Sequence, residues 1–204
     1  MSTRRFLAFE SDPVTTARRL LGQELVHVVG GRRLAGRIVE VEAYLGPVDR
    51  AAHTFGGRRT ARNASMWEGG GHAYVYFTYG MHHCLNVVCG EEGAGAAVLL
   101  RALEPTEGLE QMFARRPAAR SATELCSGPG RLTQALGIDL ARDGSDLRSD
   151  SELWIEQLRS LPLPNARIVA TRRIGVDYAG RWARRRLRFL IRGNPHVSRP
   201  RENC

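Results

Sequence analysis

Two glutamates and a tyrosine alternate with aliphatic residues in the stretch GRIVEVEAYLG, residues 36–46. Because successive side chains of a β-strand point to opposite faces, Glu40, Glu42 and Tyr44 would share one face of a strand. A carboxylate placed on such a face can activate a water molecule as a general base, and Glu42 is the candidate for that role. The competing interpretation is a solvated face whose glutamates pair with arginines, which is the commoner situation.

Tyrosines in the stretch HAYVYFTYGMHHCLNVV, residues 72–88, could contact a flat ligand. Tyr76, together with Tyr44 and His53 from the preceding stretches, could sandwich a planar heterocycle. The alternative is a sheet face on which aromatic side chains pair across neighbouring strands, and the sequence alone leaves both interpretations open.

The same stretch is predicted to form a β-hairpin whose tip is Tyr79, Gly80 and Met81. A large aromatic side chain at a hairpin tip has little core in which to be buried. Architectural DNA-binding proteins push such side chains between base steps, so Tyr79 and Met81 are candidates for intercalation into a duplex.

Arg101 and Asn86 are polar residues in stretches that are otherwise apolar. An unpaired charge among the leucines around Arg101 would be costly, so this residue needs a carboxylate or an anion as partner, and Glu42 is a candidate. Asn86 could read a base edge through its amide, although an asparagine in a strand more often contacts the backbone.

Clustered arginines near the end of the chain indicate a surface that contacts phosphate groups. Arg184, Arg185 and Arg188 belong to the run RRRLR. Arg131 follows a glycine at an expected helix start, where it could hold a phosphate beside free backbone N–H groups. A solvated helix arginine is the equally simple alternative for Arg131.

Composition favours a polyanionic partner. The chain has 204 residues, a formal net charge of +9 and a pI of about 10.4. Its 30 cationic residues are all arginines, a side chain that binds phosphate bidentately and stacks on bases. Since the sequence contains no lysine, no lysine side chain can form a Schiff base, and only the terminal amine could do so.

No cofactor or metal is expected, because the four cysteines form no C-x-x-C element and no His/Cys cluster has zinc-like spacing. The amino-terminal stretch lacks the apolar segment of a signal peptide, and no apolar run approaches the roughly 20 residues of a membrane span. We therefore expect a soluble cytoplasmic protein with no membrane partner, associated with the nucleoid through DNA.

Turn and capping residues divide the rest of the chain into elements. Asp12 and Pro13 begin a helix that ends near Gly22. Thr106 is expected to cap a helix that continues through Phe113. The other predictions are a strand at 23–29, a long ordered loop at 47–71, a buried strand at 95–105, a mobile basic loop at 115–123, a helix at 128–137, a polar exposed segment at 139–151, and strands at 166–171 and 187–191.

Strands and helices that follow no strict alternation predict a single α+β domain over residues 1–204. We expect a mixed or antiparallel curved sheet at its core, surrounding helices and a protruding β-hairpin. Residues 199–204 are expected to be a flexible tail, and the protein is expected to be a monomer.

The chain resembles the alkyladenine (3-methyladenine) DNA glycosylases, monofunctional enzymes that excise alkylated and deaminated purines. The resemblance covers nearly the whole chain, from about Phe9 to Ser198. It rests on five collinear motifs: GRIVEVEAYLG with DRAAH, YVYFTYGMHHCLNVV, VLLRALEP, ELCSGPGRLTQALGI and RWARRRLRFLIRGNPHVS.

The resemblance implies a role for each candidate residue. Glu42 would activate the attacking water and Arg101 would help to hold it. Asn86 would exclude normal guanine by a clash with its 2-amino group. Tyr44, His53 and Tyr76 would form the pocket for a flipped base, Tyr79 would fill the gap left in the duplex, and Arg131 would contact phosphate.

The expected partner is double-stranded DNA that carries damaged purines, and the expected reaction leaves an intact abasic strand. Two other functions fit the charge and the tyrosines. One is a non-catalytic protein that binds damaged DNA on the same scaffold, and the other is a protein that binds or modifies RNA. A base-release assay distinguishes the first, and competition between duplex DNA and RNA distinguishes the second.

Overall fold

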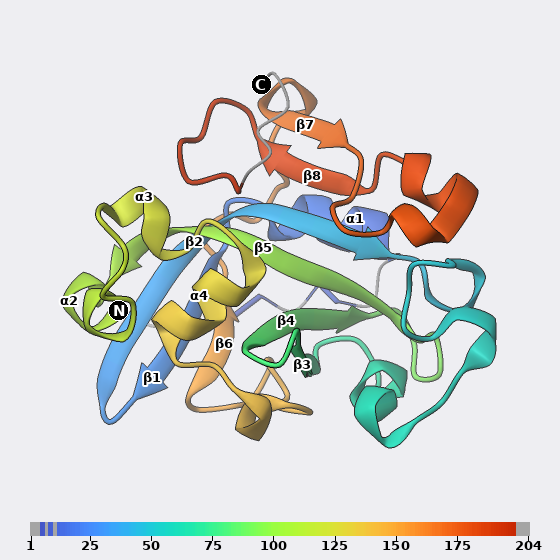
Figure 1. Cartoon of the computed structure of the whole chain (residues 1–204), viewed down its shortest axis with the longest axis horizontal. Coiled ribbons are helices and arrows are strands. Elements are labelled where there is room, and N and C mark those ends of the chain that lie inside the picture. Colours follow the sequence, from blue (N-terminus) through green and yellow to red (C-terminus); the bar gives the residue numbers. More distant parts are fainter. Residues whose placement is uncertain (1–4, 7, 10–11, 199–204) are drawn as a thin grey trace.

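The computed structural model describes residues 5–6, 8–9 and 12–198, so the predicted tail at 199–204 lies outside the described residues (Figure 1). A curled antiparallel sheet with helices packed around it makes up one compact α+β unit, which confirms the predicted fold class. The strands are β1 Glu24–Val29, β2 Arg32–Tyr44, β3 Ala73–Thr78, β4 His82–Cys89, β5 Ala96–Glu107, β6 Leu153–Glu156, β7 Ile168–Thr171 and β8 Arg188–Ile191.

Helices and short 3-10 turns cover the sheet and fill its connections. The α-helices are α1 Pro13–Leu20, α2 Leu109–Arg115, α3 Ala122–Leu125 and α4 Pro129–Leu136. The 3-10 helices are η1 Gly46–Val48, η2 Phe55–Gly57, η3 Ala61–Trp67, η4 Leu140–Arg142, η5 Asn165–Arg167 and η6 Asp177–Arg184. All the α-helices described are too short to span a bilayer.

The long strand β2 is the spine of the sheet. Along one edge it pairs with β5, and along the other it pairs first with β1 and then with β8. From there the sheet continues through β5 to β4 and β3, and through β1 to β6. Register irregularities lie on both sides of Glu40, and such irregularities bend a strand and re-aim its side chains.

One cross-strand row on this sheet positions the candidate site. Glu42 on β2 pairs with Leu99 on β5, which pairs with Asn86 on β4, which pairs with Tyr74 on β3. On its other edge Glu42 pairs with Arg188 of β8. Because directly paired residues project from the same face, four strands direct their side chains to one region.

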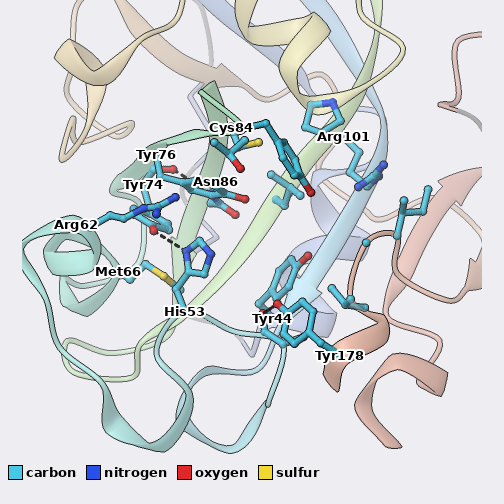
Figure 2. Close-up of a pocket in the computed structure, with 18 residues that line it drawn as sticks. Tyr44, His53, Arg62, Met66, Tyr74, Tyr76, Cys84, Asn86, Arg101 and Tyr178 are labelled. Atoms are coloured by element: carbon cyan, nitrogen blue, oxygen red, sulfur yellow. Dashed lines mark hydrogen bonds between the residues drawn. The ribbon is translucent and has the colours of Figure 1, made fainter. Parts of the chain in front are cut away.

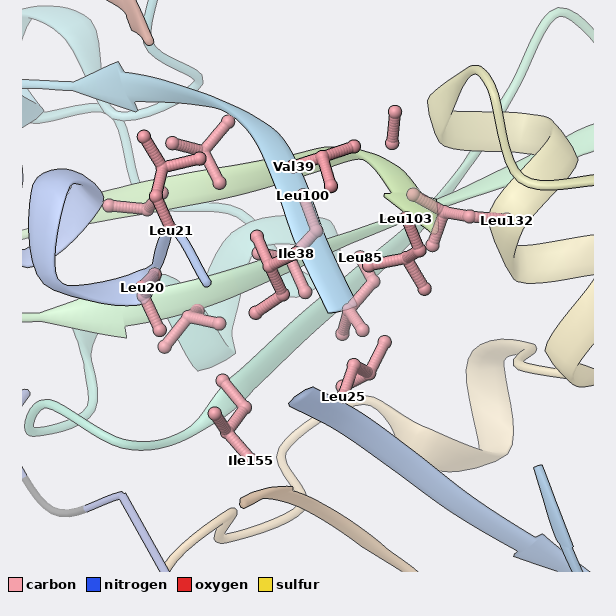
Figure 3. Close-up of a cluster of buried hydrophobic side chains, with 14 of the residues drawn as sticks. Leu20, Leu21, Leu25, Ile38, Val39, Leu85, Leu100, Leu103, Leu132 and Ile155 are labelled. Atoms are coloured by element: carbon pink, nitrogen blue, oxygen red, sulfur yellow. The ribbon is translucent and has the colours of Figure 1, made fainter. Parts of the chain in front are cut away.

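The opposite face of β2 contributes to the main hydrophobic core, as its alternation predicts. Val39, Val41 and Ala43 are all buried there. Figure 3 shows this cluster, in which leucines from α1, β4 and β5 meet Ile38 of β2. Each such side chain contributes roughly 1.5–3 kcal/mol when it is fully buried, so this core is what fixes the position of the sheet.

The predicted helix start at Thr106 is wrong. Thr106 belongs to the end of β5, where its hydroxyl donates a 2.6 Å hydrogen bond to Glu24. The helix begins instead at Leu109, after Gly108 has turned the chain with a φ of 78°. The start of α1 is confirmed, since the Asp12 carboxylate accepts hydrogen bonds from the first helical N–H groups.

Candidate active site

A cavity of about 360 Å³ opens on the sheet face that carries the row from Glu42 to Tyr74. Figure 2 shows it enclosed by side chains from several strands and loops. Its lining residues include Tyr44, His53, Arg62, Met66, Tyr74, Tyr76, Tyr79, Cys84, Asn86, Leu99, Arg101, Ile174 and Tyr178. The structure therefore brings together the predicted pocket residues from four separate parts of the chain.

Aromatic rings form the facing walls of the cavity (Figure 2). Tyr44 and Tyr178 lie on one side, across from His53, Tyr74 and Tyr76. The His53 and Tyr76 rings meet edge to face, with centroids 4.7 Å apart. The Tyr74 and Tyr76 rings are tilted by 30° with centroids 5.3 Å apart, so the cavity presents flat apolar surfaces to a ligand.

The protonation states of these rings follow from their surroundings. Burial raises the pKa of both the Tyr74 and Tyr76 hydroxyls, so both keep their protons. Partial burial and the charges of Arg62 and Arg58 lower the pKa of the His53 imidazolium, which leaves the ring neutral near pH 7. A 2.7 Å hydrogen bond joins His53 Nδ1 to the Tyr74 hydroxyl and fixes the histidine at the cavity.

Glu42 is fully buried and adjoins the cavity through the groups that hold it. Its Oε1 accepts a 2.8 Å hydrogen bond from the backbone N–H of Ile174 and lies 3.2 Å from Nη1 of Arg101. Its Oε2 accepts a 2.9 Å hydrogen bond from the Tyr44 hydroxyl. Burial and the charge of Glu42 raise the pKa of Tyr44 well above its usual value, so that hydroxyl stays a donor.

Arg101 has two carboxylate partners rather than one. Its Nε donates to Glu40 at 2.9 Å while its Nη1 pairs with Glu42. Burial alone would lower the pKa of this guanidinium, but the charges of Glu42 and Glu40 raise it, so Arg101 stays cationic. Both glutamates therefore pair with arginine, as the competing interpretation of this strand expected. The strand face is not solvated, however, because both glutamates are 0% exposed.

The predicted phosphate contact of Arg188 is wrong, because this residue is buried. Its side chain is 0% exposed, and its Nε donates a 2.7 Å hydrogen bond to Glu40. A guanidinium held in this way inside the protein does not reach a DNA backbone. Arg131, Arg184 and Arg185 are exposed, and Arg185 lies over the ring of Trp182 with 4.7 Å between its Cζ and the ring centroid.

Asn86 makes the backbone contact that its position in a strand allowed. It is 4% exposed and its Nδ2 donates a 3.1 Å hydrogen bond to the backbone carbonyl of Tyr74. The same side chain lines the cavity. The backbone contact therefore fixes the amide at the position where a ligand would meet it.

The β3–β4 hairpin presents its tip to solvent, as predicted. Tyr79 is 82% exposed and Met81 is 69% exposed. Tyr79 also has a φ of 51°, a left-handed conformation that costs energy in a residue with a Cβ. Its ring belongs to the lining of the cavity, so the tip lies at the cavity mouth.

A buried ion pair that supports Tyr44 was not predicted from the sequence. Arg173 binds Asp49 bidentately, with contacts of 2.5 and 2.9 Å, and both side chains are completely buried. The Arg173 guanidinium also lies 4.7 Å from the centroid of the Tyr44 ring. This pair joins the segment after β2 to the segment after β7, and no local pattern connects two residues so far apart.

Tyr178 and Arg62 also line the cavity and were not among the predicted site residues. Tyr178 lies in η6, an element that the arginine-rich sequence did not suggest. Arg62 lies 5.4 Å from the Tyr76 ring centroid and donates to the carbonyl of Phe77, which ties η3 to the hairpin. Among the described residues no group of three or more His, Cys, Asp or Glu side chains could hold a metal ion.

Comparison with known proteins gives a consistent result. The sequence model of a family described as methylpurine-DNA glycosylase matches residues 7–195. The chain is 50% identical over 199 residues to the DNA-3-methyladenine glycosylases of Mus musculus and Homo sapiens, covering 93% of this chain but only 59% and 66% of those proteins. A putative 3-methyladenine DNA glycosylase of Bacillus cereus (strain AH187) is 45% identical over 198 residues, with 94% of this chain and 96% of the relative covered.

Proposed function

The chain belongs to the methylpurine-DNA glycosylase family, and from this premise we propose that it hydrolyses the N-glycosidic bond of damaged purines in duplex DNA. The observation that carries the proposal is the buried carboxylate of Glu42, held by Arg101 and Tyr44 beside a cavity with aromatic walls. A cavity of this shape receives a flat base, and the carboxylate supplies the chemistry.

The target bond of a base in a duplex is inaccessible, so the nucleotide has to leave the stack at a cost of a few kcal/mol. In the proposed complex the base lies between Tyr44 on one side and His53 and Tyr76 on the other, where each stacking contact is worth roughly 1–3 kcal/mol. Tyr79 fills the space left in the duplex, and Met81 packs beside it. Their exposure at the mouth of the cavity supports this arrangement.

Glu42 acts as the general base in the proposed reaction. It takes a proton from a water molecule whose oxygen forms the new bond to the anomeric carbon of the sugar. The bond from that carbon to the base nitrogen breaks, and its electron pair leaves with the base. The carboxylate also stabilises the positive charge that develops on the sugar, and Arg101 holds the water.

Purines that carry a positive charge, such as 3-methyladenine, are favoured substrates, because they are good leaving groups and are attracted to the faces of the tyrosines. Asn86, held by its bond to the Tyr74 carbonyl, discriminates against guanine by a clash with the 2-amino group. Arg131, Arg184 and Arg185 contact phosphates and position the protein without reading sequence.

A panel of duplexes that each contain 3-methyladenine, 7-methylguanine, hypoxanthine or ethenoadenine tests the proposal. We expect release of free base from at least the cationic lesions, and no release from a matched undamaged duplex. Released base and the remaining strand are both scored. Tight binding of every damaged duplex without release of any base would instead identify a non-catalytic damage-binding protein.

The absence of lysine leads to a prediction about the strand. Glycosylases that also cut the strand use an amine that forms a Schiff base with the abasic sugar, and here only the terminal amine could do so. We therefore expect that borohydride added during turnover traps no efficient covalent adduct and that the strand stays intact until it is treated with alkali. An adduct formed in proportion to base release would contradict a purely hydrolytic mechanism.

A further inference from the structure

The guanidinium of Arg101 is held by three different groups behind the cavity wall. Its Nε donates to Glu40 at 2.9 Å, its Nη1 pairs with Glu42 at 3.2 Å, and its Nη2 donates to the Ser198 hydroxyl at 3.4 Å. Arg101 is 6% exposed, so solvent contributes little to holding it. Its orientation towards Glu42 therefore depends on the groups that bind its other two nitrogens.

Glu40 is the centre of this arrangement, and it is anchored from the end of the described chain. Arg188 Nε donates to Glu40 Oε1 at 2.7 Å, and the Ser198 hydroxyl donates to the same oxygen at 2.8 Å. The backbone N–H of Ser198 donates to Oε2 at 2.6 Å. A fully buried carboxylate with this many donors cannot turn away from Arg101 without breaking several charge-assisted bonds.

Glu40 also limits how Arg101 can bind Glu42. An arginine and a carboxylate left alone in a buried site tend to form a bidentate pair that occupies both carboxylate oxygens. Here Glu40 takes Nε, so the close ion-pair contact made by Glu42 is with Nη1 alone. The second oxygen of Glu42 is approached by the Tyr44 hydroxyl and not by the guanidinium.

We propose that Glu40, secured by Arg188 and Ser198, is a positioning residue that holds Arg101 in a one-point contact with Glu42 and so keeps the Glu42 carboxylate able to bind and deprotonate water. This inference rests on the proposed glycosylase function and assigns a role to a glutamate that does not line the cavity. In this proposal the buried Arg188 helps to hold Glu40 and does not contact DNA.

The test compares Glu40→Gln with the wild type in single-turnover base release, using the duplex of the panel that the wild type cleaves fastest. We expect the rate at saturating enzyme to fall about 100-fold, the loss that a displacement of about 1 Å in a catalytic arrangement causes. Affinity for the same duplex should be unchanged, because Glu40 does not itself line the cavity. Glu24→Gln is the matched control, since Glu24 of β1 is paired with Arg33 and does not line the cavity.

A second variant separates positioning from stability. Removing Glu40 alone takes a buried carboxylate partner away from Arg188, which destabilises the fold. In Glu40→Gln/Arg188→Met both charges are removed, so we expect the thermal midpoint to recover towards that of the wild type while the rate stays low. Recovery of the rate together with stability would overturn the proposal, because Glu40 would then only balance Arg188.

The outcomes distinguish this inference from the function on which it depends. If the wild type releases no base from any duplex of the panel, the proposed function is wrong. If the wild type is active and folded Glu40→Gln cleaves at the wild-type rate, the function stands and the positioning role is wrong. Equal losses of binding and rate in folded Glu40→Gln would also overturn the positioning role.

Discussion

We expect a Glu42→Gln variant to release damaged bases about 10³-fold more slowly than the wild type, within the range for the loss of a general base, and still to bind the damaged duplex. Glutamine has the shape of glutamate, and its amide oxygen can accept the bonds from Ile174 and Arg101. The Tyr44 hydroxyl can turn to accept a bond from the new amide group, since a hydroxyl both donates and accepts. We therefore expect the cavity to keep its shape and to lose only the proposed general base.

Single-turnover cleavage and equilibrium binding to the same duplex measure this effect. Thermal unfolding provides a check, because Arg101 loses one of its two carboxylate partners in the variant. Glu24→Gln, which changes a glutamate far from the cavity, should retain the wild-type rate. Cleavage by Glu42→Gln at a rate close to that of the wild type would show that another group activates the water.

We expect Arg173→Met to lower the free energy of unfolding by about 3–5 kcal/mol, the usual cost of removing one partner of a buried ion pair. The variant leaves the Asp49 carboxylate fully buried without its guanidinium. Asp49 also accepts hydrogen bonds from the backbone N–H groups of Leu45 and Ala51, so it cannot move out to solvent without unfolding this loop. Tyr44 loses the cation over its ring at the same time.

Chemical denaturation of the two proteins gives the difference directly. Arg33→Met is the matched control, because Arg33 pairs with three carboxylates, of Glu24, Glu107 and Glu156, but its side chain is 26% exposed. Partly exposed pairs of this kind contribute little, so we expect a loss of no more than about 1 kcal/mol for each pair. A larger loss in Arg33→Met than in Arg173→Met would mean that the number of partners matters more than burial.

Local sequence patterns predict the elements that carry the cavity. The alternation in β2, the tyrosine hairpin of β3 and β4, and the apolar run of β5 are each visible in a short stretch of sequence, and all four strands are present. Their placement brings Tyr44, Tyr76, Asn86 and Arg101 to one cavity. Local patterns fail at Thr106. A threonine before a helical stretch has the sequence signature of a helix cap, but here Thr106 belongs to the sheet as part of β5.

Contacts between distant parts of the chain account for the residues that were missed or given the wrong role. Arg188 comes shortly after three consecutive arginines and looks like part of an exposed strip. Its strand β8 pairs with β2, however, and this pairing directs the Arg188 side chain towards Glu40. Asp49 and Arg173 are separated by 124 positions, and neither has a neighbour that signals its partner. Burial of a charge is a property of the assembled sheet, so it cannot be inferred from the residues on either side.

The anchoring of Glu40 by Ser198 has a consequence for synthesis of the protein on the ribosome. The two glutamates are translated within the first quarter of the chain and Arg101 near its middle, whereas Ser198 emerges only after β8 has been made. The hairpin and the residues that line the cavity are all made before Ser198. In the proposed mechanism, the groups that secure Glu40 and so orient Arg101 are therefore synthesised after every residue that lines the cavity.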